Sequence, residues 1–223
     1  MKNSIRMKSK ISLLLLLFIS AGLIAQTAQS DKKSKEILEG VSAKYKSFKS
    51  LKATFNILVE NTKDKKKDVQ KGIISLRGNS YKLEIAGQDV ISDGKTRWTF
   101  LKDANEIQID NLKVDENSIT PTNVFTLYEK GWNSKFTGEI KKGALTYELI
   151  ELVPTDPKSK NVFKVKLTIN KQDKFISSAQ IFDKNGNIQT ISVDTFSPNA
   201  ITDDSVFSFN AGKYPGAEVI DLR

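Results

Sequence analysis

The hydrophobic and polar positions of the chain follow two different periods. An early segment has its apolar residues at helical spacing, behind Ser34 as a candidate N-cap. These apolar residues are Ile37, Leu38, Val41, Tyr45 and Phe48. From Leu51 onward the period changes to two. The pattern predicts one amphipathic helix followed by a β-strand that runs to about residue 60.

Alternating segments of the same kind continue to the end of the chain. They predict strands at about 69–77, 81–85, 90–91, 98–100, 107–109, 132–140, 145–153, 162–169, 175–182 and 188–196. Asn185-Gly186 predicts a tight turn, and residues 203–206 predict a helical turn before a last short strand. The order of elements indicates an α+β domain built on one strongly curved antiparallel sheet of about 11 strands.

Several predicted strands are apolar at both parities, for example Ile73-Ile74 and Val90-Ile91. A sheet that is covered on both faces explains this pattern. A sheet that curves around an apolar cavity explains it equally well. Both interpretations stay open at this point.

The stretch AGQDVISDGKTRWTF, residues 86–100, resembles a phosphate-binding loop because Gly94 is followed by Lys95 and Thr96. A P-loop has four residues between its two glycines, whereas six separate Gly87 from Gly94. Asp93-Gly94 instead predicts the turn of a β-hairpin. The segment is therefore not expected to bind a nucleotide.

Residues 118–131 interrupt the strands with an unusually apolar connection, SITPTNVFTLYEKG. Thr122 or Asn123 can cap a short helix that carries Val124, Phe125 and Leu127. We expect a loop helix here.

The first 25 residues have the composition of a secretory signal. Basic residues precede the apolar run 11–25, which is too short to span a bilayer, and a polar segment follows. The alternative is a membrane anchor. We expect a signal peptide over residues 1–25, cleaved after Ala25, and a single domain over residues 26–223.

Composition excludes several classes of function. The mature chain keeps 31 Lys and Arg against 26 Asp and Glu, an excess too small to predict nucleic-acid binding. The chain has no Cys and no His. Nucleophilic triads, thiolate zinc sites, histidine metal sites and a lipid-carrying Cys are therefore excluded. We expect neither an enzyme nor a bound cofactor or metal.

The segment SDGKTRWTF, followed by EIQI, resembles the Ser-Asp-Gly-Lys-x-x-Trp signature of the LolA family, periplasmic carriers of outer-membrane lipoproteins. The resemblance extends over nearly the whole mature chain. It includes SFKSLKATFNI, GIISLRGNSYKLEI and TPTNVFTLYEKGW. It also includes the late segment from LTINKQDKF to ISVDTF. It implies an open β-barrel in which the N-terminal helix and the loop helix form a lid over an apolar cavity.

The resemblance also implies roles for individual residues. Arg77 corresponds to the arginine that locks the lid, and we expect it to hydrogen-bond the segment 121–129. Gly78, Asn79 and Tyr81, in and beside the loop after Arg77, are the predicted partner-docking residues. Gly78 stands where the family often has proline, a departure that predicts a more mobile loop. The acyl-chain cavity is predicted to be lined by Phe55, Ile57, Leu83, Trp98 and Phe100. The predicted lid helix carries Val124, Phe125 and Leu127.

The function that the resemblance implies is transport. A monomeric periplasmic protein shields the acyl chains of lipoproteins and moves them from the inner to the outer membrane. Its expected partners are lipidated lipoproteins, an inner-membrane ABC transporter of the LolCDE type and an outer-membrane acceptor resembling LolB. The alternative is a LolA-like sensor that binds lipid or lipoprotein without delivering it.

Overall fold

The computed structural model describes residues 21–62, 66–112 and 127–223, with side chains of the first helix described from Lys32 onward. Most of the predicted signal peptide, and both Val124 and Phe125 of the predicted lid helix, lie outside the described residues. The elements are α1 (Ala21–Lys46), β1 (Leu51–Asn61), β2 (Lys67–Arg77), β3 (Ser80–Ile85), β4 (Gln88–Ser92), β5 (Thr96–Leu101), β6 (Glu106–Asn111), η1 (Leu127–Glu129), β7 (Trp132–Lys142), β8 (Leu145–Pro154), β9 (Val162–Asn170), β10 (Ile176–Asp183), β11 (Asn187–Pro198), η2 (Asp204–Phe207), η3 (Ala211–Lys213) and β12 (Glu218–Asp221).

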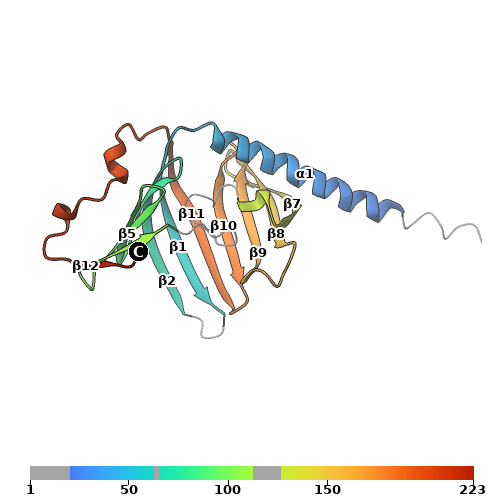
Figure 1. The fold of residues 1–223 in the computed structure, drawn as a ribbon. Coiled ribbons are helices and arrows are strands. Elements are labelled where there is room, and N and C mark those ends of the chain that lie inside the picture. Colours follow the sequence, from blue (N-terminus) through green and yellow to red (C-terminus); the bar gives the residue numbers. More distant parts are fainter. Residues whose placement is uncertain (1–20, 63–65, 113–126) are drawn as a thin grey trace, which may run out of the picture.

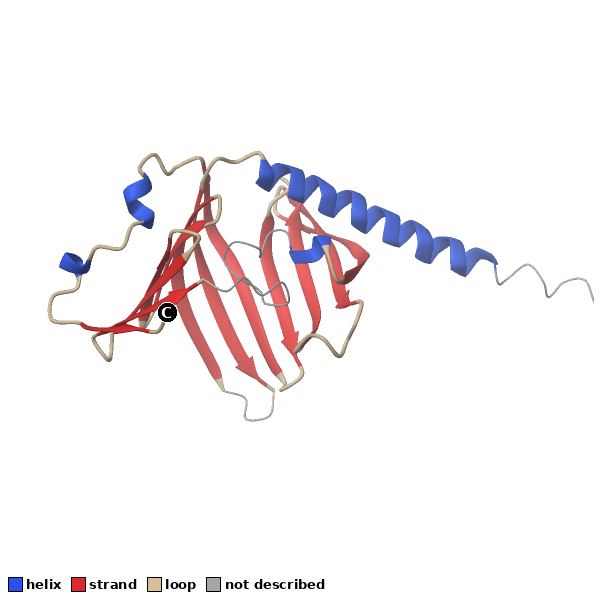
Figure 2. Ribbon diagram, in the orientation of Figure 1, coloured by secondary structure: helices blue, strands red, loops and turns tan. Residues whose placement is uncertain are grey.

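The strands form one strongly curved sheet, with α1 lying across its upper end (Figure 1). The strand order is β12-β6-β5-β4-β3-β2-β1-β11-β10-β9-β8-β7, so β1 pairs with β11 and joins the two halves of the chain. Every neighbouring pair is antiparallel except β12 and β6, which are parallel. The predicted open, curved antiparallel sheet is confirmed, with twelve strands in place of about eleven (Figure 2).

The register of the strands sorts the side chains onto two faces. Residues paired directly across neighbouring strands point to the same face of a sheet. The row Ala53, Ile74, Leu83 and Val90 therefore shares one face. The row Ile57, Ile191, Ala179, Leu167 and Ile150 continues that face across the other half of the sheet. We call it the inner face and the opposite side the outer face.

Two hydrophobic clusters cover the inner face. In the first, Ile37, Leu38 and Val41 of α1 pack onto β8, β9 and β10. The second lies on β1 to β4, with Leu51, Ala53, Phe55, Ile74, Leu76, Tyr81 and Val90 buried in it. Tyr45 packs against both clusters, so the apolar lining is continuous from one half of the sheet to the other.

The helix α1 begins before the position that the sequence predicts. Ser34 lies inside the helix and is fully buried, with its Oγ 2.8 Å from the Oγ of Ser134. The prediction that Ser34 caps the helix is therefore wrong. Its hydroxyl forms a hydrogen bond with β7, which satisfies a polar group on the buried side of the helix.

The hairpin predicted at Asp93-Gly94 is confirmed. The Asp93 carboxylate accepts hydrogen bonds from the backbone N–H groups of Lys95 and Thr96, each at 2.8 Å. Gly94 has a φ of +91°, a conformation that glycine adopts without strain. The side chain of Asp93 and a left-handed glycine thus close the β4–β5 connection, which is not a phosphate-binding loop.

The C-terminal segment 199–217, which we call the strap, crosses from the end of β11 to the outer face of β3 to β6 (Figure 1). The predicted helical turn is confirmed as η2, and Asp203 caps it by accepting a hydrogen bond from the N–H of Ser205. Ile91 and Ile107 of the sheet are buried on this face, and so is Phe207 of the strap. Val90 and Ile91 are therefore both apolar because both faces of β4 are covered.

Candidate functional site

The apolar inner face of β1 to β4 is the candidate binding surface. Beside its buried residues it carries the partly buried side chains of Ile57, Leu83 and Ile85, and Ile191 and Val193 of the neighbouring strand β11 pack against the same cluster. Gly72 of β2 makes room for the ring of Phe55. A Cβ built at position 72 would lie 2.4 Å from Cζ of that ring. This part of the sheet thus presents a broad surface of hydrocarbon side chains that α1 covers only in part.

The structure divides the five predicted cavity residues between the two faces. Phe55, Ile57 and Leu83 lie together on the inner face, and their contact with acyl chains stays a prediction. Val90 pairs with Thr99, so Trp98 and Phe100, the neighbours of Thr99 in β5, point to the outer face. The prediction that all five residues line the same cavity is therefore wrong for Trp98 and Phe100.

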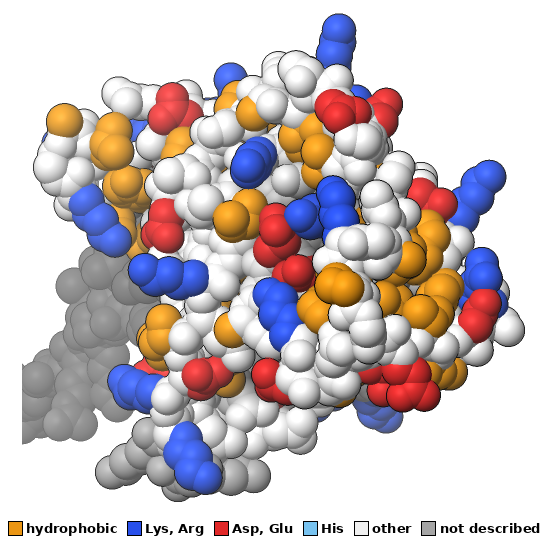
Figure 3. Space-filling model, turned by 90° about the vertical axis from the view of Figure 1, so that its left-hand side faces the viewer, with side chains coloured by type: hydrophobic (Ala, Val, Ile, Leu, Met, Phe, Trp, Pro, Cys, Tyr) orange, Lys and Arg blue, Asp and Glu red, His pale blue; other side chains and the backbone are white. Residues whose placement is uncertain are grey.

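Trp98 and Phe100 instead anchor the strap. Trp98 stacks on Phe209 with ring centroids 5.7 Å apart, and Phe209 stacks on Tyr214 at 5.6 Å. Tyr214 also contacts Phe100 at 4.6 Å. Figure 3 shows the strap side of the molecule, where hydrophobic side chains are interspersed with charges of both signs. The aromatic residues of β5 therefore fasten the C-terminal segment to the sheet.

Arg77 is also engaged with the strap. Its Nη1 donates to the carboxylate of Asp204, and its Nη2 donates to the backbone carbonyl of Ile201. Arg77 has the parity of Ile73, which places it on the outer face. Residues 121–126 lie outside the described part of the chain, so a hydrogen bond to them stays a prediction. The two described partners belong to the C-terminal segment.

Replacement of Arg77 by Leu is expected to loosen the strap locally. Hydrogen bonds to charged groups contribute about 1.5 to 3 kcal/mol each, and the exposure of Asp204 reduces this value. We expect the backbone amides of residues 201–208 to exchange hydrogen about tenfold faster in Arg77→Leu. Arg97→Leu is the matched control, because Arg97 pairs with Asp110 at 3.0 Å on β6. Equal exchange in both variants would contradict a role of Arg77 in holding the strap.

The predicted docking residues lie in different environments. Gly78 and Asn79 are exposed at the β2–β3 turn, where Gly78 has a φ of +56°. Tyr81 is buried in the inner-face cluster, and burial raises the pKa of its hydroxyl. Tyr81 therefore cannot dock a partner in this conformation, and that part of the prediction is wrong. Gly78 and Asn79 stay candidates for docking.

The helix α1 is fixed to β7 and η1 by polar contacts as well as by its apolar residues. Ser42 donates a buried hydrogen bond of 3.0 Å to the hydroxyl of Tyr128. Lys46 forms an ion pair of 2.6 Å with Glu129, and this hydrogen bond lowers the pKa of the Glu129 carboxyl. Leu127, a predicted lid residue, belongs to the same short 3₁₀ turn. The helix and this turn therefore form one unit over the inner face.

Stability at alkaline pH is expected to report on this unit. Burial raises the pKa of Tyr128 from an ordinary value of 10.0 to about 12. Between these values the unfolded chain ionises while the folded protein keeps the phenol neutral, so the free energy of unfolding falls as pH rises from 10 to 12. In urea titrations over this range, Tyr128→Phe should show a weaker pH dependence than wild type. An identical slope would contradict the burial of this phenol.

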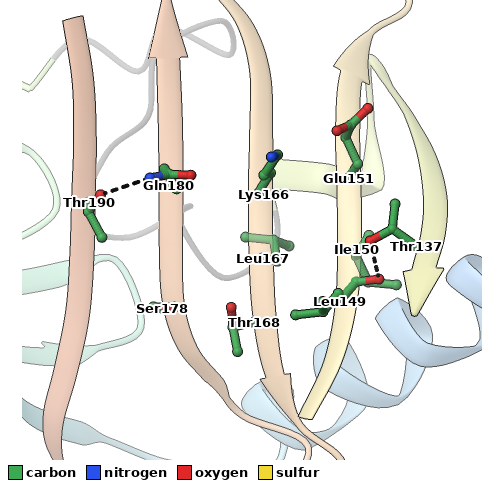
Figure 4. Close-up of a pocket in the computed structure, with 10 residues that line it drawn as sticks. All are labelled: Thr137, Leu149, Ile150, Glu151, Lys166, Leu167, Thr168, Ser178, Gln180 and Thr190. Atoms are coloured by element: carbon green, nitrogen blue, oxygen red, sulfur yellow. Dashed lines mark hydrogen bonds between the residues drawn. The ribbon is translucent and has the colours of Figure 1, made fainter. Parts of the chain in front are cut away.

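The outer face of β7 to β11 bears a hollow of about 340 Å³ with mixed polar and apolar walls, Leu149 among the apolar residues (Figure 4). Its walls include the side chains of Thr137, Glu151, Lys166, Gln180 and Thr190. Gln180 donates a hydrogen bond of 3.4 Å to the Thr190 hydroxyl. Hydroxyl, amide and charged groups do not favour hydrocarbon chains. The paired residues Glu151 and Lys166 lie on the face opposite to Ile150 and Leu167, so the hollow is not a continuation of the apolar inner face.

Sequence reasoning missed several residues of both surfaces. Ile74, Leu76 and Val90 complete the inner-face cluster, and their alternation in the sequence already marks them as strand residues. The strap residues Asp204, Phe209 and Tyr214 had no recognisable signal, because their partners in β2 and β5 are distant in the sequence.

Among the described residues, no helix is long and apolar enough to cross a membrane. Comparison with curated protein sequences finds no match. The solved structures that are similar to this one include the following two. An uncharacterized conserved protein from Thermus thermophilus is 12% identical with a TM-score of 0.57, covering 85% of this chain and 99% of that chain. The lipoprotein LppX from Mycobacterium tuberculosis is 14% identical with a TM-score of 0.51, covering 78% and 99%.

At these identities the two structures share the fold of the protein and nothing finer. The family comparison is more specific. The family model described as outer membrane lipoprotein carrier protein LolA matches residues 46–210, which include the inner-face strands and most of the strap. This chain belongs to the LolA family of outer membrane lipoprotein carrier proteins.

Proposed function

We propose that the protein is a periplasmic carrier that holds the acyl chains of lipoproteins against its inner face. The observation that carries this proposal is the continuous apolar lining of β1 to β4, in which Ile57, Leu83 and Ile85 stay partly exposed. A surface of this kind removes hydrocarbon from water without requiring any specific polar contact. The description of the family as a carrier supports the same proposal.

The energetics define what a carrier has to supply. Three acyl chains of about fifteen carbons are held in a bilayer by roughly 35 kcal/mol, at about 0.8 kcal/mol per buried methylene. Acyl chains cannot cross the aqueous space at this cost unless the carrier offers an apolar surface that buries a similar amount of hydrocarbon. Extraction also needs an energy source, and the Gly87 to Thr96 segment is a hairpin that cannot cradle phosphates. A LolCDE-type ABC transporter is therefore the proposed donor of cargo, and a LolB-like protein is the proposed acceptor.

The lid belongs to this proposal. The unit of α1 and η1 covers one half of the inner face, and residues 121–126 are proposed to extend it as a short helix. Cargo then competes with the apolar side chains of the lid for the same surface, which keeps cargo binding weak enough for release. The role of Arg77 is revised by its described partners. Arg77 holds the strap through Asp204 and Ile201. We propose in addition that it can hydrogen-bond the lid segment 121–126.

A transfer experiment tests the proposed function. The purified protein is loaded with a fluorescent triacylated lipopeptide and mixed with acceptor vesicles bearing a LolB-type receptor. A carrier binds the lipopeptide and passes it to the acceptor. Binding without transfer would favour the alternative, a sensor that recognises lipid or lipoprotein without delivering it. Absence of lipopeptide binding would contradict both functions.

A further inference from the structure

The junction between α1 and β1 is strongly basic and carries two aromatic side chains. Residues 44–52 read KYKSFKSLK, with four lysines, two aromatic residues and no acidic residue. We call this stretch the basic–aromatic segment. Lys44, Lys46, Lys49 and Lys52 are all exposed.

The aromatic residues of the segment belong to a larger cluster. Tyr45 and Phe48 both contact Phe196 of β11 edge-on, with ring centroids 5.6 and 5.7 Å apart. Phe175, from the β9–β10 connection, stacks on the same ring at 5.4 Å. Phe48, Phe175 and Phe196 are each only partly buried. The α1–β1 junction, the β9–β10 connection and the end of β11 thus meet at the upper end of the sheet in Figure 1, in one aromatic surface that is partly open to solvent.

Ordinary structural roles account for only part of the lysines. Lys44 and Lys46 lie in the last turn of α1, where positive charge interacts favourably with the helix dipole. Lys46 also pairs with Glu129. Lys49 and Lys52 lie beyond the helix. Within the described residues, no ion pair uses Lys44, Lys49 or Lys52. The neighbouring β9–β10 connection adds one exposed acid, Asp173, so the surface keeps an excess of positive charge.

The position of the cluster connects it with the inner face. Tyr45 packs against both hydrophobic clusters, and Phe196 packs against the cluster that contains Phe55. The basic–aromatic segment therefore lies at the rim of the apolar lining. A membrane that contacts this rim is adjacent to the surface proposed to receive acyl chains.

We propose that the basic–aromatic segment docks the protein onto an anionic lipid bilayer. Lysines pair with phosphate groups, while aromatic rings favour the interface between headgroups and hydrocarbon. Alternation of the two residue types within nine positions fits a bilayer surface better than an acidic protein, which offers no hydrocarbon layer beneath its charges. The inference rests on the proposed function, since docking places the inner face next to the source or destination of cargo.

Vesicle sedimentation tests the proposal. The protein is isolated after export, and an intact-mass measurement determines where its N-terminus lies. Wild type is expected to bind vesicles of 30% phosphatidylglycerol in phosphatidylcholine at least about tenfold more tightly than pure phosphatidylcholine, and to lose this preference at high salt. The triple variant Lys44→Gln, Lys49→Gln, Lys52→Gln should lose most of the preference, at about fivefold per lysine. The matched control replaces Lys71, Lys135 and Lys158, which are exposed elsewhere. Equal loss in both triple variants would overturn the proposal, because net charge alone would then explain binding.

A second measurement locates the bilayer on the molecule. In Phe48→Trp, tryptophan fluorescence should be quenched by brominated acyl chains more strongly than in wild type, which contains Trp98 and Trp132. Phe163→Trp is the control, because Phe163 is 44% exposed on β9. Equal quenching of the two variants would contradict docking through the segment. A separate binding assay compares vesicles with a poly-glutamate peptide, and binding of the wild type to the peptide but not to vesicles would also contradict the proposal.

Binding of an acylated lipopeptide in the absence of vesicles separates this inference from the proposed function. If the lysine triple variant keeps lipopeptide binding and loses vesicle binding, the docking proposal is supported. If wild type docks on vesicles but binds no lipopeptide, the carrier proposal fails while the docking surface stands.

Discussion

Phe55→Asp is expected to abolish binding of acyl ligands, with a loss of affinity of at least about 100-fold. Phe55 is buried at the centre of the inner-face cluster, and a carboxylate there disfavours hydrocarbon by about 3 kcal/mol or more. Displacement of a hydrophobic dye by a lipopeptide measures the effect. Leu83→Asp is a second variant at a partly buried position, in case Phe55→Asp does not fold.

Trp98→Asp is the informative control for this prediction. Trp98 is as apolar as Phe55 but lies on the outer face, beneath the strap. We expect its lipopeptide affinity to stay within about twofold of wild type, because the variant leaves the inner face unchanged. If Trp98→Asp and Phe55→Asp impair binding equally in folded proteins, the assignment of the binding surface to the inner face is wrong.

Val41→Asp is expected to have the largest effect on stability. Val41 is fully buried between α1 and the sheet, and an unpaired carboxylate at such a position costs about 3 to 5 kcal/mol. The expected result is a strongly lowered urea midpoint, or a helix released from a sheet that stays folded. Ala43→Asp introduces the same charge on the exposed side of α1 and should change stability by less than about 0.5 kcal/mol. Equal midpoints for the two variants would contradict the packing of α1.

The strands could be predicted from the sequence because alternation is a local signal. The predicted boundaries of 145–153 and 162–169 differ from β8 and β9 by about one residue. The face of each strand is a different matter. Apolar residues on β5 and on β1 look alike in sequence, and only the pairing of Val90 with Thr99 shows that Trp98 and Phe100 point outward.

The covering of the outer face could not be predicted because it depends on contacts between distant segments. Arg77 meets Asp204, which lies 127 positions further along the chain, and Trp98 meets Phe209. A strand arginine alone indicates neither its face nor its partner. For Ser34 the local signal was misleading. Serine favours helix caps, but Ser34 lies inside α1 and its buried hydroxyl hydrogen-bonds the hydroxyl of Ser134 on β7.

Photo-crosslinking in the periplasm tests the central claim most directly. A photoreactive phenylalanine analogue is placed at position 83 on the inner face, or at position 98 on the outer face. The proposed function predicts that irradiation joins position 83 to the acyl chains of lipoproteins, as mass spectrometry of the cross-linked peptides identifies, and that position 98 forms no such product. Acyl cross-links at position 98 and none at position 83 would contradict the claim that the inner face carries the cargo.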